Sequence, residues 1–232
     1  MALPFDTFAA TLEYEDLPQE LLWTLRRSFT DTIGTAAVAS TTEMANVARR
    51  GALVVFGAGS AGSARILMHG GSVSPVGAAM AGAFTVDAVD AHDTTTPCKG
   101  HAGSAVFPAL LALADAIDRP VTGAEFAVWL TVAYEVSYRA GLAQHATCAD
   151  YHTSGAWTST GVATAAARAM GLTSQQIRHA AGIGEFHGPR SQMMRCIDHP
   201  TMLRDGVGWG APSGLTAAYL AREGFTGAPA LT

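Results

Sequence analysis

The stretch LVVFGAGSAG, residues 53–62, decides whether the chain is expected to have an α/β or an all-α fold. In it an apolar run is followed by Gly57, Gly59 and Gly62 in the spacing G-x-G-x-x-G. A dinucleotide-binding α/β fold needs this turn to be followed by a helix, a second strand and an acidic residue about 20 residues further on. The chain continues with SARILMHGGSVSPVGAAMAGAF, which is rich in Gly and Ser and holds no β-branched run that would form that strand. We therefore predict a loop between helices here, and no binding of NAD.

Signals of helix starts and ends recur along the rest of the chain, whereas the alternation typical of strands does not. Asp16 and Pro18 are typical of a helix start, and Ser74-Pro75 opens a second helix of small residues. Further caps and helix ends are predicted at Thr122 with Glu125, Thr173 with Gln176, Gly171, Gly224 and Ser213. The one strand candidate, residues 53–56, is too short to anchor a sheet. The sequence thus predicts an all-α protein, a multi-helix bundle of about eight helices that forms a single domain over residues 1–232.

The composition limits the partners that the chain can have. Of 232 residues, 49% are hydrophobic and 14% are charged, and the formal net charge is −5. The absence of a concentrated basic face argues against nucleic acid and against an anionic membrane surface. The longest uncharged stretch, residues 70–86, is too short to span a bilayer. Three widely spaced cysteines and an N-terminus without a signal-peptide pattern favour a cytoplasmic protein, and the large uncharged surface favours an oligomer.

Polar side chains gather in three loops, each placed before or beside an apolar helix. Residues 86–104 carry Asp87, Asp90, His92, Asp93, Lys99 and His101. Residues 145–155 carry His145, Asp150, Tyr151 and His152, and residues 185–211 carry His187, Arg190, Arg195, His199, Arg204 and Asp205. Such residues often only cap helices and contact water. Three histidine-bearing loops are more consistent with one pocket at an end of the bundle.

These residue types suit general acid–base chemistry on an acidic substrate. Histidine shuttles protons near neutral pH, a neighbouring aspartate orients it, and arginine binds a carboxylate through two parallel hydrogen bonds. Of fourteen basic residues only Lys99 is a lysine, which favours recognition of planar carboxylate or phosphate groups. A zinc site at His92, Cys98 and His101 lacks the short paired spacing of such sites. We therefore predict no metal site and no cofactor.

Five stretches of the sequence are similar to one known family. They are LPQELLWTLRRSFTDTIGTAAVAS, DAHDTTTPCKGHAGSAVFPALLALAD, AYEVSYRAG, YHTSGAWTSTGVATAAARAMGLTSQQ and FHGPRSQMMRCIDHPTMLRDGVGWGAPSGLTAAYLAREGFTG. They resemble, in order, the MmgE/PrpD family, which includes 2-methylcitrate dehydratase, cis-aconitate decarboxylase and iminodisuccinate epimerase. The resemblance implies a helical domain, a homodimer formed through it, and metal-free chemistry at the carbon next to a carboxylate.

The resemblance also implies roles for residues of the first loop. The family's D-x-D-D-T motif falls on Asp90, His92, Asp93 and Thr94, so that His92 stands where the family has an acidic residue. His101 follows just before the next helix. We expect His101 to act as acid or base, Asp90 and Asp93 to orient it or to act as bases, and Thr94 to hydrogen-bond the substrate.

Roles in the other two loops follow in the same way. A histidine of the family falls on His152, the second acid or base, and the lysine of its M-x-K-D-G motif falls on Arg204. Arginine keeps the charge but does not readily give up a proton, so we expect Arg204, with Arg190, to bind the substrate carboxylate. Lys99 is a further candidate for substrate binding.

Together with these residue types, the resemblance implies a lyase or isomerase that acts on a small di- or tricarboxylate, with dehydration ahead of epimerisation or decarboxylation. Family enzymes continue into a second, α+β lid domain, whereas this sequence ends at GFTGAPALT, about where that domain begins. We expect a separate lid-bearing chain as a candidate partner. The alternative is a non-catalytic dimerisation or partner subunit of a longer paralogue.

Overall fold

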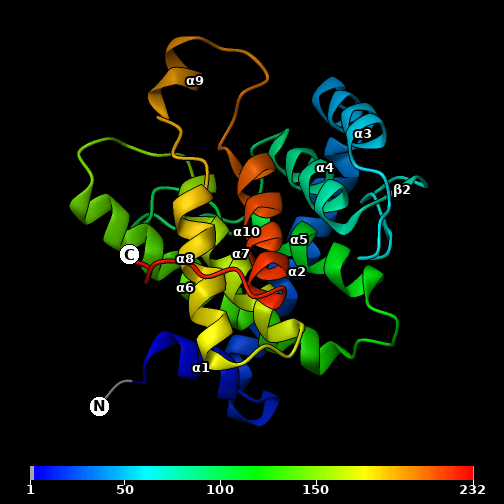
Figure 1. The fold of residues 1–232 in the computed structure, drawn as a ribbon. Helices are drawn as coiled ribbons and strands as arrows, with labels where there is room; N and C mark the ends of the chain where they lie inside the picture. The colour runs from blue at the N-terminus through cyan, green and yellow to red at the C-terminus, as the bar shows by residue number, and fades with distance from the viewer. Residues whose placement is uncertain (1–2, 232) are drawn as a thin grey trace.

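Helices make up most of the residues that the structure, a computed structural model, describes, which are residues 3–231. Within that range the prediction of an all-α bundle is confirmed, with ten α-helices in place of about eight. In chain order they are α1 (Phe5–Thr11), α2 (Gln19–Ala39), α3 (Glu43–Val55), α4 (Pro75–Asp87), α5 (Gly103–Ala116), α6 (Gly123–Thr147), α7 (Gly155–Ala169), α8 (Ser174–His187), α9 (Met194–Asp198) and α10 (Val207–Arg222) (Figure 1).

Most of the predicted helix ends are confirmed. The hydroxyl of Ser74 accepts a hydrogen bond from the backbone N–H of Gly77 at 3.2 Å, so it caps α4. Thr122 and Thr173 form the expected capping boxes of α6 and α8. Gly171 and Gly224 follow α7 and α10 with φ of 72° and 93°, in the left-handed conformation that glycine adopts without strain.

The one strand candidate, residues 53–56, forms no strand, because residues 53–55 are the last turn of α3, whose N-terminus Thr42 caps. Two predicted helix caps are wrong. Asp16 ends a short 3₁₀ helix, η1 (Tyr14–Asp16), and α2 begins after Pro18. Ser213 lies inside α10, which starts after Gly206.

The glycines of residues 57–62 lie in the connection between α3 and a small hairpin, as predicted. The hairpin pairs β1 (Ala64–Arg65) with β2 (Ser72–Val73) in antiparallel register. It is the only sheet within the described residues. A two-stranded hairpin provides no parallel strand end for a dinucleotide, so the structure agrees with the predicted loop.

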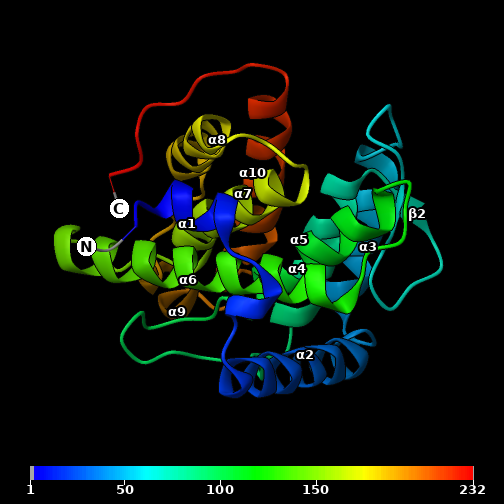
Figure 2. The ribbon, with the colours of Figure 1, turned by 90° about the horizontal axis from the view of Figure 1, so that it is seen from below.

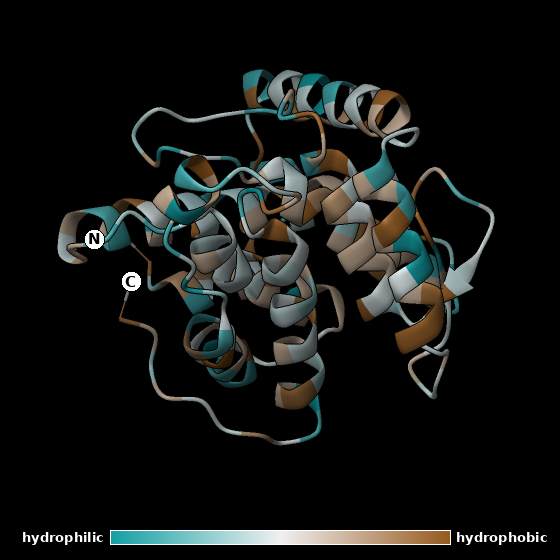
Figure 3. Ribbon diagram, turned by 90° about the horizontal axis from the view of Figure 1, so that it is seen from above, coloured by the Kyte–Doolittle hydropathy of each residue, from teal (hydrophilic) through white to brown (hydrophobic). Residues whose placement is uncertain are grey.

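Small side chains let the central helices approach closely. Helix α7 packs against α6, α8 and α10, and its residues from Gly155 to Ala167 are all buried. A methyl group at Gly161 would overlap the carbonyl oxygen of Ala133 and the hydroxyl of Ser137, both on α6. Figure 3 shows the central helices, among them α7 and α10, mostly pale to light brown, whereas the peripheral α2 alternates teal with brown along its length.

Outer segments complete the fold. The long helices α2 and α6 lie on the same side of the molecule, and the chain after α10 runs back along α8 (Figure 2). There the backbone N–H of Leu231 donates to the carboxylate of Glu185 at 3.0 Å. Residues 188–206, which include α9, stand away from the helical body (Figure 1, top). Across the described part of the chain, none of the helices combines the length and the apolar character that a bilayer crossing needs.

Candidate functional site

The three polar loops meet where α8 ends and α10 begins. The backbone N–H of His101, in the first loop, donates to the Ser154 hydroxyl of the second at 2.9 Å. The backbone N–H of Ser154 donates in turn to Oδ1 of Asp205, in the third loop, also at 2.9 Å. The N–H of Thr153 donates to the Ser191 carbonyl at 2.9 Å. Ser154 therefore ties the two outer loops together.

His101 is held in one orientation by its Nδ1, which lies 2.6 Å from the carbonyl oxygen of Asp93. A carbonyl oxygen only accepts, so Nδ1 carries the hydrogen and Nε2 keeps its lone pair in the neutral ring. Nε2 lies 3.6 Å from Oδ1 of Asp90, and the His101 side chain is 19% exposed. Asp90 has φ of 52° and a mostly exposed carboxylate. A solvent-accessible imidazole nitrogen beside a carboxylate is suited to accept a proton.

Asp93 anchors the first loop. Its Oδ1 accepts from the backbone N–H of Gly103, at the start of α5, at 3.0 Å, and its Oδ2 accepts from the hydroxyl of Tyr134 on α6. Burial and the adjacent Asp93 charge raise the pKa of Tyr134 well above its ordinary value, so the phenol stays protonated and donates. Both oxygens are occupied, which suits Asp93 to positioning and not to proton transfer.

His92 lies beneath His101 and is fully buried. The two ring centroids are 4.1 Å apart, and Nε2 of His92 lies 3.2 Å from Oδ1 of Asp87. Burial opposes a charge on this ring, but the hydrogen bond to Asp87 and the nearby charges of Asp90 and Asp93 outweigh it and raise the pKa of His92.

Asp205 joins this buried group from the third loop. Its backbone N–H donates to Oδ2 of Asp87 at 3.1 Å. Burial raises the pKa of Asp205 to about 6, against the hydrogen bonds from Ser154 that favour its charged form, and the Asp87 charge adds to the increase. Four residues for which the sequence predicts no role hold the loops together through hydrogen bonds: Asp87, Asp205, Ser154 and Tyr134. The sequence drew attention only to the two aspartates, by their presence in polar loops.

His152 occupies a separate position in the second loop. It is buried, and its Nδ1 lies 2.8 Å from the carbonyl of Asp150. Its backbone pairs with that of Gln192 in the third loop. Within residues 3–231 no hydrogen bond or ring contact joins His152 to His101. The chain from His152 to Ser154 connects them.

Arginines line a cavity of about 450 Å³ in the third loop. Arg190, Arg195 and Arg204 contribute to its wall, together with Thr153 and Trp209. The sequence predicted substrate-binding roles for Arg190 and Arg204 but none for Arg195. Nη2 of Arg190 also lies 3.1 Å from the sulfur of Cys148. A wall of three guanidinium groups suits an anionic ligand.

The remaining candidates lie apart from this cavity. Thr94 donates to the Gly100 carbonyl at 3.4 Å and, with Asp93, lines another cavity, of about 660 Å³, beside Tyr134. Lys99 has φ of 50°, and its ammonium lies 5.5 Å from the centre of the Tyr151 ring.

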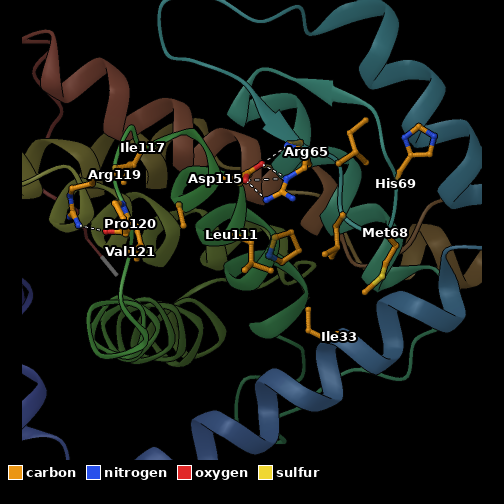
Figure 4. Close-up of a pocket in the computed structure, with 16 residues that line it drawn as sticks. Ile33, Arg65, Met68, His69, Leu111, Asp115, Ile117, Arg119, Pro120 and Val121 are labelled. Atoms are coloured by element: carbon orange, nitrogen blue, oxygen red, sulfur yellow. Dashed lines mark hydrogen bonds and ion pairs between the residues drawn. The ribbon is translucent and has the colours of Figure 1, made fainter.

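A further cavity, of about 750 Å³, is elsewhere again. Figure 4 shows Arg65 and Asp115 paired in its wall, with Ile33 of α2 and Leu111 of α5 nearby. None of the candidate site residues lines it, and Arg65, Asp115 and Arg119 in its wall are already ion-paired.

Comparison with known proteins bears on the whole chain. The search among curated proteins gives no match. A family model described as the MmgE/PrpD N-terminal domain matches residues 5–232, which covers nearly all of the sequence. Together with the helical bundle and the loops that carry the family's motifs, this match shows that the chain belongs to the MmgE/PrpD family and corresponds to its N-terminal domain.

Proposed function

We propose that the chain performs acid–base chemistry at the carbon next to a carboxylate of a small di- or tricarboxylate, with dehydration as the leading reaction. The observation that carries this proposal is the arrangement of His101: Nδ1 is fixed on the Asp93 carbonyl, and Nε2 is partly exposed beside Asp90. Membership of a family that includes dehydratases supports the reaction class.

The chemistry sets two requirements. A C–H bond next to a carboxylate is a weak acid, and the charge that develops when the proton leaves spreads onto the carboxylate oxygens. His101 is the proposed base for the proton, and Arg190 and Arg204 are the proposed cationic donors that meet the charge. In dehydration the leaving hydroxyl also needs a proton, which His152 is proposed to supply. No cofactor takes part in this scheme.

Exchange of the α-proton with solvent tests the proposal. The full chain, treated with a chelator, is incubated in deuterated water with citrate, 2-methylcitrate or aconitate, and deuterium incorporation is followed by mass spectrometry. His101→Gln should slow exchange by about 10²- to 10⁴-fold, because it removes the base. His69→Gln, at an exposed position in the hairpin connection, is the matched control and should leave the rate unchanged. Unchanged exchange in the double variant His101→Ala, His152→Ala would rule the assignment out.

A second candidate is a non-catalytic partner of a longer family member. The observation that favours it is Arg204, which stands where the family has a lysine that can exchange a proton. In this case the purified chain alone binds none of the three carboxylates and exchanges no proton. Restoring the family residue in Arg204→Lys distinguishes the two candidates: activity that appears only with the lysine supports the second.

A further inference from the structure

We propose that Asp90, His92 and His101 bind a divalent first-row transition-metal ion such as zinc. One donor atom from each of the three side chains lies within 4.8 Å of the other two. Two imidazoles and one carboxylate form a donor set that suits zinc, iron, cobalt or nickel better than calcium or magnesium. The proposal rests on the geometry of the donors and not on the proposed function, although both use His101.

His92 provides the strongest reason for a ligand. Its side chain is 0% exposed, and Nε2 is committed to the carboxylate of Asp87. The other ring nitrogen, Nδ1, is buried and has no hydrogen-bond partner. An unpaired buried polar atom is costly. In the neutral ring with the hydrogen on Nε2, where Asp87 accepts it, Nδ1 holds a lone pair that a metal ion would engage. Although burial opposes the charge, the nearby carboxylates raise the pKa of His92, so the ion displaces the proton that the charged ring carries on Nδ1.

His101 repeats this arrangement with its nitrogens exchanged. Nδ1 donates to the Asp93 carbonyl, so Nε2 holds the lone pair. Metal-binding histidines usually donate their second ring N–H to a carboxylate or a carbonyl, which fixes the tautomer. Asp87 and Asp93 fill those two roles here, and Asp87 is itself held by the backbone N–H of Asp205.

The spacing of the donors is close to what a metal requires. Bonds of about 2.0–2.1 Å in a tetrahedral site place neighbouring ligand atoms roughly 3.3 Å apart. Nε2 of His101 and Oδ1 of Asp90 are 3.6 Å apart. The mostly exposed side chain of Asp90 leaves the outer side of the site open, so water or an anion completes the coordination.

The three donors are not the set His92, Cys98 and His101 that was considered from the sequence, because Asp90 takes the place of Cys98. Cys98 is buried elsewhere, with its thiol donating to the Tyr138 carbonyl at 3.2 Å, and so lies outside the donor set. Asp90 has a left-handed backbone, and the loop then folds back between Thr95 and Gly100, which pair. This fold-back brings His101 over His92 although nine positions separate them.

Metal binding and the proposed acid–base role compete for one atom. A bound ion occupies Nε2 of His101, the nitrogen that would accept the substrate proton. Added zinc should therefore inhibit proton exchange, and a chelator should restore it.

Titration of the metal-free full chain tests the site without substrate. Zinc is followed by calorimetry, and cobalt by the visible absorption that a low-symmetry nitrogen and oxygen site gives. We expect one saturable site per chain. Asp90→Asn should weaken it at least tenfold, because asparagine tolerates the left-handed backbone but lacks the charged donor. His92→Gln should do the same, since its amide nitrogen can still donate to Asp87 while the Nδ1 donor is lost.

The control and the contrary outcomes are equally direct. His69→Gln removes an exposed imidazole away from the site and should leave the affinity unchanged. Circular dichroism and thermal melting show whether each variant is folded. Absence of a saturable site, or equal affinity in folded Asp90→Asn and in the unmodified chain, overturns the proposal. Because exchange is measured in chelator-treated protein, the metal site and the proposed function fail independently of one another.

Discussion

At the scale of single residues, the loops are fixed by acidic groups that the fold keeps away from water. Asp87 accepts hydrogen bonds from both His92 and the backbone of Asp205, and these two bonds offset the cost of burying its charge. Asp205 is less well compensated: Oδ1 accepts from Ser154, but Oδ2 is buried without a partner. A buried carboxylate of this kind makes folding depend on pH.

Replacing Asp205 should make that dependence visible. Its pKa is about 6 in the folded chain, against an ordinary value of 3.8 for an aspartate. The folded state therefore holds the proton more tightly than the unfolded state does, and the stability that the proton contributes is complete below about pH 4 and lost as the pH rises through about 6. Asp205→Asn keeps an oxygen for the Ser154 N–H and has no charge to bury.

The free energy of unfolding in urea, measured for both proteins from pH 4 to pH 7.5, checks this. The unmodified chain should lose on the order of 2 kcal/mol relative to Asp205→Asn over that range. Asp118→Asn, at an exposed turn after α5, is the control and should run parallel to the unmodified chain. Parallel curves for Asp205→Asn as well would contradict the assigned burial of its charge.

Tyr134 allows a second test at this scale. Tyr134→Phe removes the hydroxyl that donates to Asp93 and leaves Oδ2 of a partly buried carboxylate without that donor. We expect a loss of about 1–3 kcal/mol in the free energy of unfolding. Tyr219→Phe, whose ring carries the Arg222 guanidinium 4.9 Å from its centre, keeps that contact and should change stability by less than about 0.5 kcal/mol. Equal effects of the two substitutions would show that the Tyr134 hydroxyl is not a support of the loop.

At the scale of helices, the sequence predicts best where a few neighbouring residues decide the outcome. The caps at Ser74, Thr122 and Thr173 were predictable because each hydroxyl reaches a backbone N–H three residues ahead. The start of α10 was not. Its first turns contain glycines and Pro212, which disfavour a helix locally, yet close packing of Gly210 and Gly214 against α7 keeps them helical.

Close packing of helices can be tested at Gly161. Gly161→Ala places a methyl group against backbone and side-chain atoms of α6, so α6 and α7 have to separate. We expect a loss of about 1–3 kcal/mol or more. Gly34→Ala in α2 is the matched control, because no atom lies within 4 Å of the added methyl group and alanine is the better helix former. It should stabilise the chain by up to about 1 kcal/mol, and thermal unfolding compares the two. A Gly161→Ala protein as stable as Gly34→Ala would contradict the close approach.

At the scale of the whole molecule, the candidate site shows what spacing along the chain does not reveal. The three loops were recognisable from their histidines, aspartates and arginines. The contacts that join them were not, because Asp87 and Asp205 are 118 positions apart and Ser154 lies between them in the sequence. Nor did the sequence indicate that the arginines line a cavity whose wall includes Thr153 of the second loop but not His101.

The segment of residues 188–206 carries the last prediction, which concerns self-association. Met194, Ile197, Met202, Leu203 and Trp209 expose between 48% and 65% of their surface on or beside α9. Apolar groups gathered in this way usually mark a contact surface. We expect a second copy of the chain to cover them, in line with the homodimer that the family resemblance implies.

Sedimentation tests this dimer. It should give twice the chain mass for the unmodified chain, and Ile197→Glu should reduce it to the mass of the monomer. Val54→Glu, on the 86% exposed Val54 of α3, tests a different apolar face and should leave the dimer intact. A monomeric unmodified chain would show that the dimer does not form. Dissociation by Val54→Glu alone would place the contact on α3 instead.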